Sequence, residues 1–148
     1  MSKNILRWAA LSGMFAVILG AFGAHGLKPH LDTYQLGIFE KGVEYQFFHA
    51  LALLAVGCLP DQPQAEKWIK WSSRLFLAGI VCFSGSLYLL ACRDLLAFPV
   101  GWAGPITPIG GLCLIGAWGC LFAGCTKNKR GLKFYALQQF SVCTNSSG

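Results

Sequence analysis

Four long, uncharged and mainly apolar stretches alternate with short segments that hold the charged residues of this 148-residue chain. The uncharged stretches are 8–27, 45–60, 75–92 and 95–126. A helix rises about 1.5 Å per residue, so about 18 apolar residues cross most of the roughly 30 Å hydrocarbon core of a bilayer. Because a charge at the centre of a spanning helix costs roughly 2.5 to 3.5 kcal/mol, the pattern predicts an all-α integral membrane protein, a four-helix transmembrane bundle. The predicted spans are about 8–27, 43–60, 75–92 and 108–125, in a single domain of residues 1–130 that is followed by a C-terminal extension, 131–148.

A soluble helical bundle is the alternative interpretation of these apolar stretches. Its helices would need polar outer faces. The stretch from Leu75 to Leu90 offers only Ser and Tyr for such a face. The membrane interpretation is therefore favoured.

The charged residues also predict the orientation of the bundle. The chain has twelve Lys and Arg against six Asp and Glu, a net charge of +6. If all four stretches span, Lys28, Lys41 and Arg93 lie on one side and the other nine cations on the opposite side. The positive-inside rule then places both the N and the C terminus in the cytoplasm. The predicted topology accounts for the positive net charge. We therefore expect the lipid bilayer as a partner, and we expect no binding of nucleic acid. The nine cations are Lys3, Arg7, Lys67, Lys70, Arg74, Lys127, Lys129, Arg130 and Lys133.

Two of the connections differ from simple polar loops. Residues 28–42 mix apolar and charged side chains, which indicates an interfacial segment; Gly37 and Gly42 weaken the prediction of a short surface helix there. Residues 93–108 are apolar but interrupted by proline and glycine, which excludes a continuous helix. Proline suits the first turn of a helix, so we expect the fourth helix to begin near Pro108.

Small residues recur at helical spacing in the first and fourth spans. Such residues let helix backbones approach closely, and helices in lipid associate largely through this packing. We interpret them as packing faces rather than ligand sites, either within the bundle or toward a second copy or another membrane protein. The positions are Ser12, Ala16, Gly20 and Ala24 in the first span and Gly110, Gly111, Gly116 and Gly124 in the fourth.

Polar side chains within the spans gather, by residue count, in the outer half of the predicted bundle. At about 1.5 Å per residue, His49 lies on the order of 9 Å below a boundary near Val43. Ionisable groups inside spans often mark pathways, which indicates a proton-accepting or small-ligand site. The alternative is a set of hydrogen bonds that fixes helix register. The candidate cluster is His25, Glu44, Tyr45, Gln46, His49, Ser84, Ser86, Tyr88 and Thr107.

The sequence lacks the signatures of soluble enzymes. It contains no H-E-x-x-H, no G-x-S-x-G and no phosphate loop. Two histidines without Cys or Asp at ligand spacing are a weak metal signal. We therefore expect no catalytic residues, no metal and no cofactor.

Four separate motifs, in order along the chain, resemble a known family. They are Gly-Ala-Phe-Gly-Ala-His-Gly-Leu at 20–27, Tyr-Gln and His-Ala-Leu-Ala-Leu within 45–53, Phe-Ser-Gly-Ser-Leu-Tyr at 83–88, and Thr-Pro-Ile-Gly-Gly at 107–111. Over about residues 6–121 the chain resembles the YgdD-type family of small inner-membrane proteins of unknown function. The resemblance implies four spans and a multi-pass location in the bacterial inner membrane or a mitochondrial-type membrane. It supplies no reaction and no site residues.

Three functional hypotheses fit these features. The first is a non-enzymatic structural or partner-binding protein of the inner membrane. The second is a small proton-coupled transporter or channel that uses His25 and His49, although four spans leave little room for alternating access. The third is an accessory subunit that binds quinone or haem through the same two histidines.

Overall fold

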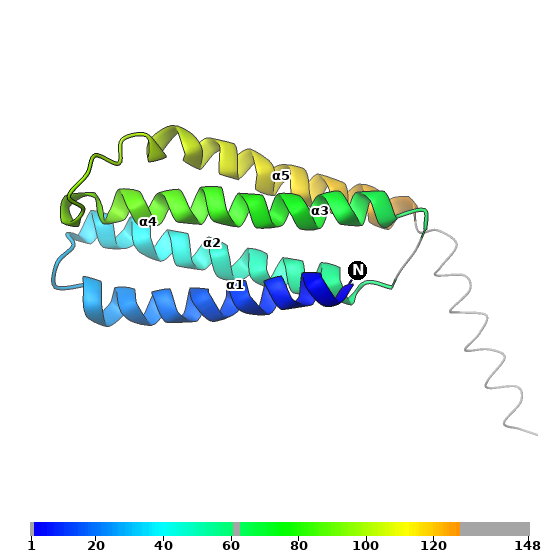
Figure 1. The fold of residues 1–148 in the computed structure, drawn as a ribbon, viewed down its shortest axis with the longest axis horizontal. Coiled ribbons are helices and arrows are strands. Elements are labelled where there is room, and N and C mark those ends of the chain that lie inside the picture. Colours follow the sequence, from blue (N-terminus) through cyan, green and yellow to red (C-terminus); the bar gives the residue numbers. More distant parts are fainter. Residues whose placement is uncertain (1, 61–62, 128–148) are drawn as a thin grey trace, which may run out of the picture.

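The computed structural model describes residues 2–60 and 63–127, which form four antiparallel helical rods (Figure 1). The described chain begins and ends at one end of the bundle, which we call the terminal end. The connections that follow η1 and α4 lie at the other end, which we call the distal end. The first rod is α1 (Ser2–Phe22) with the π-helical turn η1 (Gly23–Leu27), and the second is α2 (Thr33–Cys58). The third is α3 (Glu66–Gly79), the π-helical turn η2 (Ile80–Ser84) and α4 (Gly85–Ala91); after the 3-10 turn η3 (Arg93–Leu95), the fourth is α5 (Ala103–Lys127).

The all-α membrane fold predicted from the sequence is confirmed. Three rods are long and apolar enough to cross a membrane, over Lys3–Leu27, Glu66–Ala91 and Ala103–Thr126. Large apolar side chains cover the outside of the bundle; Val81 is 71% exposed and Phe122 72% exposed. Such a surface suits lipid better than water. The cytoplasmic placement of the termini stays a prediction.

The second rod is longer than the sequence predicted, and it is not among the three candidate membrane spans. We expected an interfacial segment over 28–42 and a separate span over 43–60, whereas α2 is one helix, Thr33–Cys58. Asp32 explains its early start, because its side chain accepts a hydrogen bond from Gln35 N while Gln35 Oε1 accepts one from Asp32 N. This capping box satisfies two backbone donors at the helix start.

The start of the fourth helix also differs from the prediction. Pro108 lies inside α5, which begins at Ala103 instead of near Pro108. The first turn is prepared by the bond from Ala103 N to Val100 O, at 2.9 Å. Proline lacks the backbone donor that would bond Gly104 O, four residues earlier. The Thr107 side chain lies in the same turn, with Oγ1 3.3 Å from Ala103 O. Pro108 therefore lies about one and a half turns into α5 at the cost of one intrahelical bond.

The core has two parts. At the terminal end all four rods contribute to one apolar cluster, which includes Ile5, Leu53, Phe76 and Ala117. At the distal end a smaller cluster joins the first three rods through residues such as Leu27 and Phe39. Between the rods, α1 packs mainly against α2, and α5 packs mainly against α3 and η2.

The small-residue face of α1 follows the helix period rather than strict steps of four. Ala16 is buried, and a Cβ on Gly20 would lie 3.3 Å from Val43 Cγ1. Ala24, which we predicted to continue this face, is exposed. Each step of four residues rotates about 40° around a 3.6-residue helix, so the stripe leaves the interface after three steps. Gly23 takes its place, because a Cβ there would lie 2.8 Å from the Phe39 ring.

The glycines of α5 lie against the third rod. A Cβ on Gly110 would lie 2.4 Å from Phe83 N and 2.7 Å from Phe83 Cα, so the two backbones touch here. A Cβ on Gly111 would meet only the Phe83 ring, at 3.8 Å. Gly116 faces Leu75 at 3.5 Å, and Gly124 faces Ile69 at 3.2 Å. These contacts make α5 the closest neighbour of α3 and η2.

Candidate functional site

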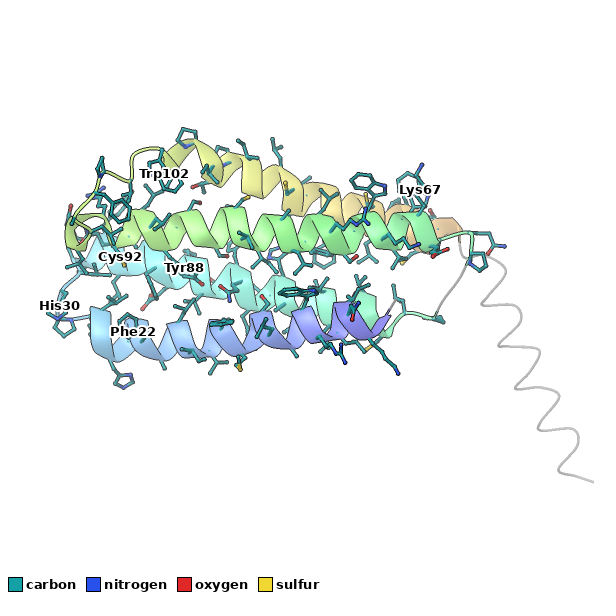
Figure 2. All side chains as sticks on the ribbon, in the orientation of Figure 1. Phe22, His30, Lys67, Tyr88, Cys92 and Trp102 are labelled. Carbon is teal, nitrogen blue, oxygen red and sulfur yellow. The ribbon has the colours of Figure 1, made fainter. Side chains whose placement is uncertain are left out.

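The central polar contact of the bundle is the side-chain amide of Gln46. It is 6% exposed, on the inner face of α2. Its Nε2 donates to Ser12 O of α1 at 2.9 Å, and its Oε1 accepts from Tyr88 OH of α4 at 2.9 Å. One amide therefore links the first three rods. Figure 2 shows Tyr88 in the distal half of the bundle.

Two serines connect the third rod to α5. The Ser86 and Thr107 hydroxyls lie 2.7 Å apart, and Ser86 Oγ also donates to Phe83 O at 2.8 Å. Ser72 Oγ, which is fully buried, donates to Ala117 O at 2.9 Å. Hydrogen bonds of this kind contribute roughly 0.6 to 2 kcal/mol in a membrane.

His49 lies apart from the Gln46 contact, against aromatic rings. Its Nδ1 is 2.7 Å from Tyr45 O in the preceding turn of α2. Its ring centroid is 5.8 Å from that of Phe76 and 6.4 Å from that of Trp118. No hydrogen-bond partner for its Nε2 is found among residues 2–60 and 63–127. The arrangement holds the imidazole between α2, α3 and α5.

His49 lies nearer the terminal end of α2 than its distal end, whereas the count from Val43 placed it near the distal end. At 1.5 Å per residue it lies about 14 Å from the end of α2 at Cys58 and about 24 Å from its start at Thr33. The prediction counted from a boundary near Val43, but the helix begins ten residues earlier than that.

Two residues of the predicted cluster, His25 and Glu44, lie away from the Gln46 contact. His25 is exposed in the turn η1, where its Nδ1 lies 3.0 Å from Ala21 O of its own helix. Glu44 pairs with Lys41 on the outer surface of α2. Tyr45 packs its ring against Phe83, with centroids 4.8 Å apart. Since His25 and His49 lie at different levels of the bundle, they do not face a common volume that could hold haem.

Two buried hydroxyls carry no partner in the part of the chain that the structure describes. They are Ser12 Oγ on α1 and Ser84 Oγ at the end of η2. Ser84 is 1% exposed, and it lies one turn before Tyr88. Buried polar groups are normally paired, so these two oxygens mark unused hydrogen-bonding capacity next to the Gln46 contact.

Two interhelical contacts were not predicted from the sequence, those of Gln35 and Ser72. Gln35, 3% exposed, donates from Nε2 to Asp94 Oδ2 and so ties the start of α2 to the turn η3. Ser72 precedes the third span that we predicted over 75–92, so it was not among the candidate residues. Gln35 and Gln46 are eleven residues apart, a spacing that places both on one helical face. That signal requires α2 to be continuous, which the sequence analysis did not assume.

The described side chains offer interhelical hydrogen bonds rather than a set of converging ionisable groups. Within residues 2–60 and 63–127, no three His, Cys, Asp or Glu side chains lie close enough to hold a metal ion. The buried polar residues are amides and hydroxyls, with His49 as the one imidazole among them. The arrangement can fix the positions of the helices relative to one another.

Comparisons with known proteins agree on one group. A family described as "Protein of unknown function (DUF423)" matches residues 19–111. The chain is 40% identical to the UPF0382 inner membrane protein YgdD of Escherichia coli strain K12 over 129 residues, 87% of this chain and 94% of that protein. It is 43% identical to the UPF0382 membrane protein SSP2132 of Staphylococcus saprophyticus over 126 residues, 84% of this chain and 98% of the relative. No solved structure matches the chain.

Proposed function

Because the chain belongs to the DUF423 family of proteins of unknown function, whose relatives are named as membrane proteins, we propose that it is a non-enzymatic structural or partner-binding protein of the bacterial inner membrane. Its relatives' names give the membrane location and no reaction. The choice among hypotheses therefore depends on what the buried polar residues do.

The observation that carries the proposal is the Gln46 amide. Both of its ends are used by other rods, Ser12 O on one side and Tyr88 OH on the other. These two bonds use one N–H and one lone pair of the amide, and they hold its plane between α1 and α4. Because an unpaired polar group in lipid is costly, the contact favours one register of the first three rods over others.

A double-mutant cycle tests this role. Tyr88→Phe removes the hydroxyl, and Gln46→Met removes the amide at similar length. If the two side chains stabilise the protein through their shared bond, we expect a coupling energy of about 0.6 to 1.7 kcal/mol for unfolding in detergent. Tyr34→Phe, a change at an exposed tyrosine of α2, is the matched control and should show no coupling with Gln46→Met. A coupling of zero between Tyr88 and Gln46 would remove the basis of the proposal.

Partner binding is supported by the outer rods. Since α1 packs mainly against α2 and α5 mainly against α3 and η2, each leaves a wide apolar face uncovered. These faces include Val17 and Ile18 on α1, and Ile115 and Phe122 on α5. We propose a second copy or another membrane protein as the partner. Photo-crosslinkers at Ile18 and Ile115 in native membranes should give a protein adduct; adducts to lipid alone would contradict it.

One observation favours a second candidate, proton transfer through His49. Its Nε2 has no hydrogen-bond partner among the described residues, and the site lies deep between three rods. On the terminal side, however, the apolar cluster around Leu53 and Phe76 closes the bundle to water. Proton flux into proteoliposomes that is abolished by His49→Gln would establish this function in place of the structural one. Equal flux with and without protein would exclude it.

A further inference from the structure

The start of the third rod carries a stripe of exposed cationic and aromatic side chains. They are Lys67, Trp71 and Arg74, which we call the α3 patch. Because they follow one another at steps of four and three residues, they share one face of the helix. Ser72 and Phe76, which are buried, belong to the face that packs on the core. The α3 patch therefore lies on the outside of the bundle, and Figure 2 shows Lys67 at the terminal end.

The two cations of the α3 patch are not neutralised by a neighbouring carboxylate. Among residues 2–60 and 63–127, no Asp or Glu forms a salt bridge with Lys67 or Arg74. The described carboxylate nearest to them along the helix is Glu66, and it pairs with Lys70. The positive charge of the patch is therefore available to a ligand.

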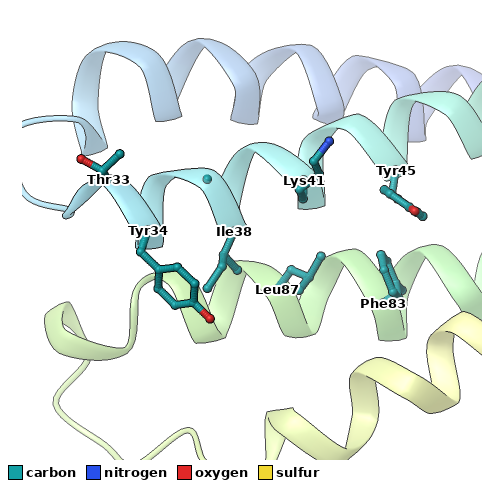
Figure 3. A pocket seen from close by; sticks show the side chains of 8 residues that line it. Thr33, Tyr34, Ile38, Lys41, Tyr45, Phe83 and Leu87 are labelled. Carbon is teal, nitrogen blue, oxygen red and sulfur yellow. The ribbon is translucent and has the colours of Figure 1, made fainter.

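The two halves of the bundle differ in charge. In the distal half, Lys41, which lines the pocket shown in Figure 3, is paired with Glu44. Among the side chains that the structure describes, the distal half has three Lys or Arg and four Asp or Glu, whereas the terminal half has five Lys or Arg and one Glu. An anion is therefore attracted to the terminal half. The residues counted are Lys28, Lys41, Arg93, Asp32, Glu40, Glu44 and Asp94 in the distal half, and Lys3, Arg7, Lys67, Lys70, Arg74 and Glu66 in the terminal half.

The order of polar and apolar residues along this face matches the order of parts in a phospholipid. Arg74 is the last charged residue before the uncharged stretch 75–92, whose 18 residues cover about 27 Å of the roughly 30 Å hydrocarbon core. Helical side chains lean toward the N-terminus, which for α3 is the terminal end, so Arg74 leans away from the apolar stretch. Trp71, 49% exposed, has the amphipathic ring that suits the headgroup level. On the other side of Arg74 the same face continues with exposed Ala78 and Val81, where an acyl chain would lie.

We propose that the α3 patch binds a phospholipid with a net negative charge, such as phosphatidylglycerol. The phosphate contacts Lys67 and Arg74, and an acyl chain extends along Val81 toward the middle of the bilayer. Arginine suits this role because its guanidinium can donate two parallel hydrogen bonds to a phosphate. A zwitterionic lipid has the same phosphate but adds a cation, which the two cations of the patch repel and which the paired Glu66 does not neutralise. The patch therefore distinguishes lipids by net charge.

Native mass spectrometry of the full-length protein in mild detergent measures the binding. Phosphatidylglycerol, phosphatidylethanolamine and phosphatidylcholine of one acyl-chain composition are added in turn. We expect phosphatidylglycerol to bind at least about fivefold more tightly than the other two, since one cation near an anionic lipid surface contributes about that factor, about 1 kcal/mol. The double variant Lys67→Gln with Arg74→Gln should lose this preference. The matched control, Lys28→Gln with Arg93→Gln, removes one exposed Lys and one exposed Arg from the distal half and should keep it.

Three results would overturn the proposal. Equal binding of the three lipids by the wild-type protein contradicts the selection by charge, and this result needs no variant that must fold. An undiminished preference in the Lys67 and Arg74 double variant, with a native circular dichroism spectrum, contradicts the patch as the site. Equal loss in the two double variants shows that the net charge of the protein, and not the patch, selects the lipid. The Gln46–Tyr88 cycle measures a different contact, so this inference and the proposed function fail separately.

Discussion

The backbone contact between α5 and η2 gives a sharp prediction for Gly110→Ala. The new Cβ would lie 2.4 Å from Phe83 N and 2.7 Å from Phe83 Cα, where ordinary contacts begin at 3.4 Å. Both atoms belong to the backbone, so no change of rotamer relieves the overlap and the rods must move apart by about 1 Å. Overpacking of this kind costs about 1 to 3 kcal/mol. The better helix propensity of alanine returns up to about 1 kcal/mol. We expect a net destabilisation of about 1 to 2 kcal/mol.

Gly111→Ala is the control, since it makes the same substitution one residue later. Its Cβ would lie 3.8 Å from the Phe83 ring, an ordinary contact. We expect it to match the wild type or to exceed it by up to about 1 kcal/mol. The assay is reversible unfolding of the purified protein in mixed micelles with increasing dodecyl sulfate, followed by circular dichroism. If Gly110→Ala is as stable as Gly111→Ala, the reasoning from close backbone contact is refuted.

Two further predictions use the same unfolding assay. Ser72→Ala removes the bond to Ala117 O between α3 and α5, so it should lower the free energy of unfolding by about 1 kcal/mol. The Ser73 hydroxyl bonds within its own helix, so the control Ser73→Ala should lower it by less than about 0.5 kcal/mol. Equal losses in the two variants would contradict the interhelical role of Ser72. Gly23→Leu should destabilise the protein by about 1 to 3 kcal/mol, because the new side chain would overlap the Phe39 ring. Ala24 is exposed, so Ala24→Leu should change the stability by less than about 0.5 kcal/mol. The opposite order would show that the small-residue face continues through Ala24.

The class of fold could be predicted from charge and hydropathy alone, because a bilayer requires long apolar helices and excludes charged residues from their centres. The residues at which the helices begin were predicted less accurately than the class of fold. Charged residues and Gly37 and Gly42 obscured the first half of α2, although Asp32 and Gln35 have the spacing of a capping box. Proline generally favours the first turn of a helix, but α5 starts before Pro108, because the bond from Ala103 N to Val100 O already begins a turn there.

The candidate site was predicted less well than the fold, and for a geometric reason. Residue counting gives a position along a helix only when the start of the helix is known, and the start assigned near Val43 placed His49 close to the distal end, whereas it lies nearer the terminal end of α2. Counting also gives no rotation about the helix axis. Tyr88 faces α2 and bonds Gln46, Ser86 faces α5 and contacts Thr107, and His25 lies on an outward face.

The pairing of rods bears on how the chain is assembled in the membrane. The strongest packing joins α1 to α2 and α3 to α5, so the first and second rods form one helical hairpin and the third and fourth rods form another. Two-stage assembly then consists of inserting two hairpins and docking one against the other. The docking surface carries the Gln46–Tyr88 bond and the contact of His49 with Phe76. Two fragments divided between Cys58 and Glu66 would each keep one hairpin intact, so they should recombine into the native bundle when they are synthesised together.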